Sequence, residues 1–138
     1  MFESLINRLR GKPETPPLPE PDEHLALGAL LVRIAKSDHH YDALEIGEID
    51  RILAAGFALK PIEAAKMRAI CEKLEAQAPG TPDFALLIRQ TVDYPHRLEM
   101  FRALCRVMRA DGSAAPEEQA ALAEIEKIFG IRAEDRPA

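Results

Sequence analysis

The chain has little of what marks secreted and membrane-spanning proteins. Its 138 residues include no tryptophan and only two cysteines, Cys71 and Cys105. Two cysteines make no disulfide framework in a chain of this length, so we expect a reducing, cytoplasmic setting. No apolar run approaches the ~18 residues of a membrane span. The first residues also lack the apolar core of a secretory signal, so we expect neither export nor membrane insertion.

An excess of basic charge is also missing. The sequence has 18 Lys and Arg residues against 23 Asp and Glu residues, a net charge of -5. A negative chain repels the phosphate backbone, so we expect no nucleic-acid partner. Apolar residues are abundant at 47%, beside 30% charged residues. This composition is typical of one compact domain with a hydrophobic core.

Proline placement divides the chain. Five of the eleven prolines lie between Pro13 and Pro21, where they favour an extended linker without a core face. Four others each precede an apolar-periodic segment and suit the first turn of a helix: Pro61, Pro82, Pro95 and Pro116. We therefore expect an N-terminal segment at 1–12, a linker at 13–22, a domain at 23–132 and a flexible tail at 133–138.

Apolar residues in the domain repeat at spacings of three and four, as in Leu27, Leu30, Leu31 and Ile34, and strand-like alternation is absent. Four glycines follow the ends of such segments, where a helix can stop: Gly56, Gly80, Gly112 and Gly130. The pattern predicts an all-α bundle of about six helices. Their expected ranges are 23–37, 43–55, 61–77, 82–92, 95–109 and 116–129. The first is apolar almost all round, so we expect neighbours on several sides.

A helix, acidic loop and second helix are written twice. Residues 31–50 align with residues 104–123, a shift of 73. Identical pairs include Arg33 with Arg106, Asp38 with Asp111, and Glu45 with Glu118. After one deletion, Phe57 matches Phe129, and an aliphatic follows two residues later in each copy, Leu59 and Ile131. The repetition of acidic as well as core positions indicates an internal duplication.

The two acidic loops carry a family resemblance. They read K-S-D-H-H-Y-D-A-L-E at 36–45 and R-A-D-G-S-A-A-P-E-E at 109–118. From Leu25 to Arg132 the chain resembles the tellurite-resistance TerB-like family, whose repeated signature is an apolar helix, Ala-Asp-Gly, a short turn and a Glu. The resemblance implies an all-α domain associated with tellurite and metal stress in bacteria. Two departures stand out: His39 replaces the usual glycine, and Ala115 removes an oxygen ligand.

The resemblance also implies divalent-metal sites at these loops, and carboxylates there suit a hard cation such as Ca²⁺, Mg²⁺ or Mn²⁺. The candidate ligands are Asp38, Asp42, Glu45, Asp111 and Glu118, with Ser113 or Glu117 as helpers. A structural alternative is open, because Asp42 and Glu45 are spaced as a helix capping box. Helix capping gives the weakest explanation for Asp38 and Asp111 among these residues. Zinc binding at His39 and His40 is disfavoured because no third strong ligand is evident.

We expect a non-catalytic binding or adaptor domain with a protein partner. One alternative is a metal-dependent hydrolase that uses the same five carboxylates. Another is a membrane-peripheral scaffold, since the segment 1–12 places Phe2, Leu5, Ile6 and Leu9 on one side of a helix. That segment would contact a membrane surface or a partner, or dock on its own domain. Neither cysteine is expected to be catalytic, because both lie on apolar faces.

Overall fold

A computed structural model describes residues 22–37, 40–77, 81–110 and 115–136. The described part of the chain is helical and has no strand. Its elements are α2 (Glu23–Lys36), α3 (Ala43–Phe57), α4 (Pro61–Gln77), α5 (Thr81–Thr91), α6 (Tyr94–Arg109), α7 (Pro116–Phe129) and a short 3-10 helix, η1 (Ala133–Asp135). The all-α prediction is confirmed, and each expected helix is found within two residues of its expected ends. The N-terminal segment lies outside the described residues.

Side-chain caps explain where several helices begin. The carboxylates of Asp22, Asp42 and Asp93 each accept a hydrogen bond from the backbone N–H three residues later. This contact satisfies a donor that the first turn leaves free. Pro61 and Pro116 begin α4 and α7, as their fixed φ favours. Asp22, which we expected to end the linker, therefore belongs to the domain as a helix cap.

Helices α3 and α7 end in the same way. Ala58 and Gly130 adopt left-handed backbone conformations, with φ of 54° and 67°. The next residue in each case, Leu59 or Ile131, donates its N–H to a carbonyl five residues earlier, at 3.0 and 3.2 Å. These are Schellman motifs, in which the residue after the left-handed position packs back on the helix. The expectation that Gly56 ends α3 is wrong, because Gly56 lies inside the helix.

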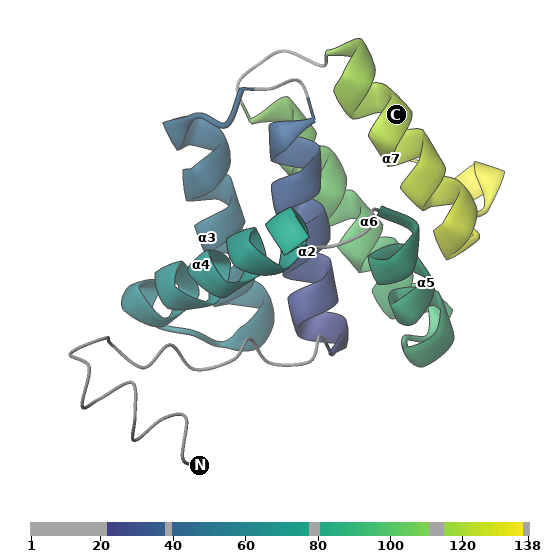
Figure 1. Ribbon diagram of the computed structural model, residues 1–138. Helices are drawn as coiled ribbons and strands as arrows, with labels where there is room; N and C mark the ends of the chain where they lie inside the picture. Colours follow the sequence, from purple (N-terminus) through teal and green to yellow (C-terminus); the bar gives the residue numbers. More distant parts are fainter. Residues whose placement is uncertain (1–21, 38–39, 78–80, 111–114, 137–138) are drawn as a thin grey trace, which may run out of the picture.

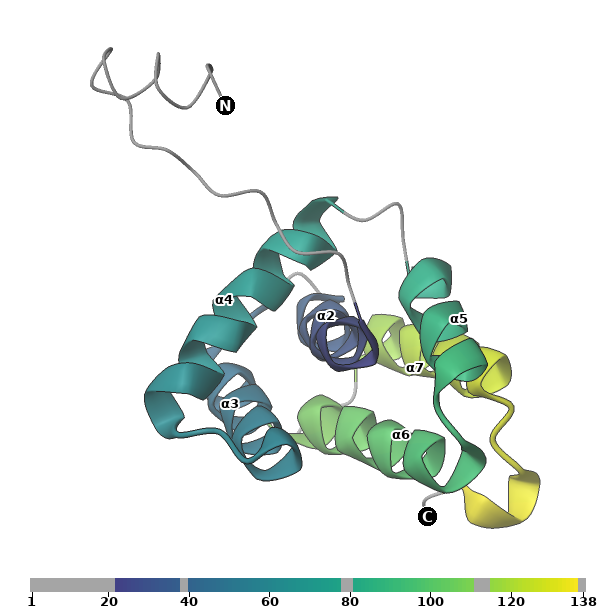
Figure 2. The ribbon, with the colours of Figure 1, turned by 90° about the horizontal axis from the view of Figure 1, so that it is seen from below.

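Helix α2 is the centre of the bundle. It packs against α4, α5, α6, α3 and α7, and Figure 2 shows it enclosed by the other helices. Its fully buried residues include Ala26, Leu30, Leu31 and Ile34. Gly28 faces Cys71 of α4 so closely that a Cβ at Gly28 would overlap the sulfur. The apolar sequence of this helix is thus explained by contacts on all sides.

The segment after α7 is held against α5 and α6. Arg89 and Arg97 both donate to the Phe129 carbonyl, at 2.8 and 3.0 Å. The Tyr94 hydroxyl donates to Asp135 of η1 at 2.6 Å. The structure therefore differs from the expected flexible tail, since residues 133–136 form a short helix and its following turn. Long side chains from α5 and α6 supply this anchoring, and helix periodicity gives no signal for it.

Candidate functional site

The acidic turns lie at one end of the molecule. The C-terminal ends of α2 and α6 and the N-terminal ends of α3 and α7 are all at the top of Figure 1. Asp42 and Glu45 begin α3, and Glu118 lies in the first turn of α7. We call this part, defined by Asp42, Glu45 and Glu118, the acidic end.

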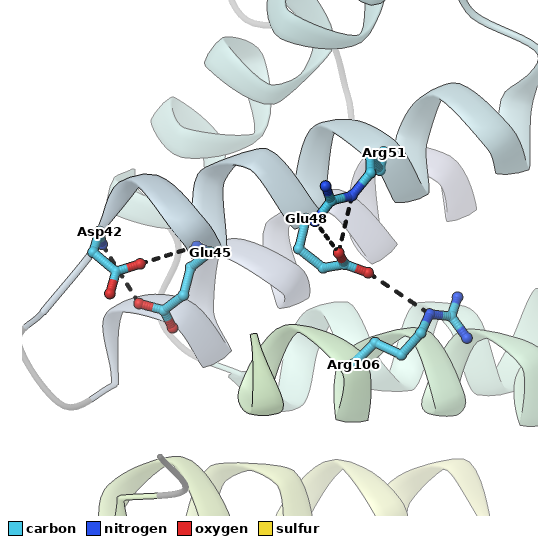
Figure 3. A network of polar contacts seen from close by, with 5 residues as sticks. All are labelled: Asp42, Glu45, Glu48, Arg51 and Arg106. Carbon is cyan, nitrogen blue, oxygen red and sulfur yellow. Dashed lines mark hydrogen bonds and ion pairs between the residues drawn. The ribbon is translucent and has the colours of Figure 1, made fainter. Parts of the chain in front are cut away.

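Asp42 and Glu45 form a complete capping box (Figure 3). The Glu45 N–H donates to Asp42 Oδ1 at 3.0 Å, and the Asp42 N–H donates to Glu45 Oε1 at 3.5 Å. The structural reading of this spacing is therefore confirmed. It accounts for the position of both side chains at the start of α3 without a ligand.

Helix α7 carries a glutamate, Glu118, at the position that Glu45 holds in α3. Its side chain is fully buried, as is that of Glu45. The cap position of α7 is Ala115, which makes no side-chain cap hydrogen bond. The neighbouring Glu117 is exposed, as a residue that only favours the helix dipole would be. Two buried carboxylates thus occupy the third residue of two helices at the same end.

The remaining candidates of the acidic loops lie outside the described residues. These are Asp38, His39, Asp111 and Ser113. Within the ranges that the structure describes, no three His, Cys, Asp or Glu side chains gather closely enough to hold a metal ion. His40 is exposed. The described carboxylates alone therefore do not form a metal centre.

Two basic side chains in the last turn of α2 pair with a glutamate of α4. Lys36, in the last turn of α2, pairs with Glu75 of α4 at 2.9 Å. Arg33 lies 3.6 Å from the other oxygen of the same carboxylate. Glu75 is itself largely buried, with 8% of its side chain exposed. These pairs tie α2 to α4.

A second feature, a groove at the opposite end, was missed by sequence reasoning. It has a volume of about 1030 Å³ and is formed by the start of α2, the end of α3, Met67 of α4 and a stripe along most of α6. Its apolar lining includes Phe57, Leu59, Met67, Val92 and Met100, all only partly buried. The sequence gives no direct signal for it, because these side chains come from four separate segments.

Polar side chains border the groove. They are Glu23, His24, Thr91, Asp93, His96, Glu99 and Arg106. The His24 ring stacks on Phe57 with centroids 4.2 Å apart, and His96 Nδ1 lies 2.5 Å from Asp93 Oδ1. Glu48 of α3 bonds Arg51 and lies 4.0 Å from Arg106 Nε of α6 (Figure 3). Of the predicted metal ligands, the three that the structure describes, Asp42, Glu45 and Glu118, do not line the groove.

The cysteines are poor nucleophiles in this fold. Cys71 is fully buried and Cys105 is 5% exposed. Burial raises the pKa of the Cys71 thiol to about 12, and burial also raises the pKa of Cys105. Since the thiolate is the reactive form, both thiols stay protonated at neutral pH.

The six described helices, with buried glutamates in the first turns of α3 and α7, define an all-helical domain. None of these described helices is long and apolar enough to cross a membrane. The family model described as "Tellurite resistance protein TerB" matches residues 24–138. The chain belongs to this family. No curated protein and no solved structure matches the chain.

Proposed function

We propose that the chain is a non-catalytic binding domain of the tellurite-resistance family whose acidic end takes up a divalent cation. Glu45 and Glu118 would supply the buried charge, and Asp38, Asp42 and Asp111 the remaining carboxylates. The observation that carries the proposal is that two fully buried glutamates, Glu45 and Glu118, occupy the third residue of α3 and of α7, whose N-terminal ends lie at the same end of the bundle. Charges in a protein interior are weakly screened, so a buried carboxylate attracts a cation more strongly than an exposed one.

Hard divalent cations suit this chemistry. Carboxylate oxygens are the ligands that Ca²⁺, Mg²⁺ and Mn²⁺ prefer, and these cations need about six or more oxygens. Backbone carbonyls and water would complete the set. The described cysteines and His40 offer no comparable arrangement for a softer metal, because both cysteines are buried within the helical core.

The hydrolase alternative is less well supported than a binding role. A metal-dependent hydrolase needs an open metal position beside a cleft that admits substrate. The groove described above lies at the other end of the bundle, and its lining includes neither Asp42 nor Glu45 nor Glu118. We therefore favour cation binding that alters the stability of the domain, or its contacts with a protein partner.

Calorimetric titration of the chelator-treated chain with Ca²⁺, Mg²⁺ and Mn²⁺ tests the proposal. We expect binding with a dissociation constant below ~1 mM, the weak limit for protein calcium modules. Glu118→Gln and the double variant Asp38→Ala, Asp111→Ala should abolish it. The matched control is Glu117→Gln, which removes the same charge from an exposed neighbour. Absence of binding, or equal loss in the control, would contradict the proposal and leave the acidic turns as helix caps.

A further inference from the structure

The groove has the chemistry of a helix-binding surface. Its lining combines the aromatic ring of Phe57 and the aliphatic side chains of Leu59 and Val92 with two methionines, Met67 and Met100. Methionine is flexible and polarisable, so it adapts to an apolar side chain placed against it. An apolar lining with a polar border is the arrangement that receives the apolar face of an amphipathic helix.

Helix α6 sets the length of the groove. Its contribution is one stripe along the helix: His96, Glu99, Met100, Ala103 and Arg106. The ten steps along the helix from His96 to Arg106 correspond to about 15 Å. An occupant that lies along α6 therefore needs about three helical turns.

We propose that the N-terminal segment of this chain, residues 2–12, occupies this groove in the same molecule. The sequence Phe-Glu-Ser-Leu-Ile-Asn-Arg-Leu-Arg-Gly-Lys places Phe2, Leu5, Ile6 and Leu9 on one face of a helix. From residue 2 to residue 12 such a helix is also about 15 Å long. The apolar face of the segment thus matches the groove in both chemistry and length.

Charge complementarity favours this occupant. The segment carries Arg8, Arg10 and Lys12 near its C-terminal end. The carboxylates of Glu23, Asp93 and Glu99 border the groove, against one arginine, Arg106. Hydrogen bonds from His96 lower the pKa of Asp93, so this carboxylate is ionised at neutral pH. The basic end of the segment therefore has acidic partners at the border, of which Asp93 also contacts His96.

The chain connection places the segment near the groove. Residues 13–21 join it to Asp22, and the next two residues, Glu23 and His24, themselves line the groove. Nine residues in an extended, proline-rich conformation span up to about 28 Å. A short tether of this kind gives an effective concentration in the millimolar range. Even a weak contact is then populated within one molecule.

Methionine methyl NMR of the full chain tests the proposal. A nitroxide attached through Ser4→Cys reports on the segment, and the two native thiols are buried. Met67 and Met100 line the groove, whereas Met108 lies on the buried part of α6 and serves as the internal reference. We expect the nitroxide to broaden the Met67 and Met100 signals several-fold more than the Met108 signal.

Two further samples make the result decisive. The double variant Leu5→Asp, Ile6→Asp should remove the selective broadening. The control Asn7→Asp also introduces a negative charge, but on the polar side of the segment, and should retain the broadening. A mixture of nitroxide-bearing chains with isotope-labelled, nitroxide-free chains separates one molecule from two. Broadening in the mixture would overturn the proposal in favour of a second copy. The proposal would be overturned altogether if, in the original sample, the Met67 and Met100 signals broadened no more than the Met108 signal. That holds whether or not the segment binds to anionic vesicles.

Discussion

At the level of single residues, Gly28 determines how closely α2 and α4 approach. A Cβ at this position would overlap the sulfur of Cys71, and both residues lie in the core. Overpacking of this kind costs about 1–3 kcal/mol. We therefore expect Gly28→Ala to lower the free energy of unfolding by this amount in urea denaturation.

Gly47 provides the matched control, because it lies within α3 and a Cβ there would meet nothing within 4 Å. Gly47→Ala should raise the free energy of unfolding by about 0.5–1 kcal/mol, since alanine loses less backbone entropy in a helix. Similar effects of the two substitutions would contradict the close contact with Cys71. The double variant Gly28→Ala, Cys71→Ala should recover part of the loss.

The buried thiol of Cys71 should make the stability of the folded chain depend on pH in the alkaline range. Burial raises its pKa from 9.0 to about 12 in the folded chain. A group whose pKa is raised on folding contributes stability below its unfolded pKa, and this contribution is lost as pH rises through the folded value. We therefore expect the unfolding free energy of the native chain, measured relative to that of Cys71→Ala, to fall as the pH rises from 9 to 12. A constant difference would show that the thiol does not titrate in the buried site.

At the level of elements, the two Schellman motifs respond oppositely to substitution. Ala58 adopts the left-handed conformation at a steric cost that glycine avoids, so Ala58→Gly should stabilise the chain by about 1 kcal/mol. Gly130→Ala should destabilise it more strongly, because the added Cβ would also meet the Arg89 guanidinium. Thermal unfolding of both variants checks this, and a loss of stability in Ala58→Gly would contradict the assignment.

These elements also show what the sequence can predict. Helix starts followed from local signals, namely the capping box of Asp42 and Glu45 and the four prolines, because caps act within one turn. The end of α3 did not follow from a local signal, since Gly56 has no special conformation and the helix stops where Leu59 can pack on the core. Local glycine content suggested a stop, but a tertiary contact determined it.

At the level of the whole molecule, the features that sequence missed are those built from several segments. The groove collects side chains from α2, α3, α4, α6 and the α3–α4 and α5–α6 turns, and its position depends on helix packing that periodicity does not specify. The carboxylates at the acidic end were named from sequence because the two loops carry aspartate and glutamate at matching spacings. Their burial, which separates Glu118 from Glu117, appears only once α7 is packed against α5 and α6.

The acidic end should bind a cation independently of the groove at the opposite end of the molecule. A ligand that binds only the folded state stabilises it by mass action, about 2.7 kcal/mol at one hundred times its dissociation constant. We expect Ca²⁺ or Mn²⁺ to raise the midpoint of thermal unfolding in the native chain and in Met100→Ala, but not in Glu118→Gln. A midpoint that rises equally in Glu118→Gln would place the cation elsewhere. Loss of the rise in Met100→Ala would instead mean that α6 couples the groove to the acidic end, since α6 borders the groove from His96 to Arg106 and ends at the same end of the molecule as the start of α7.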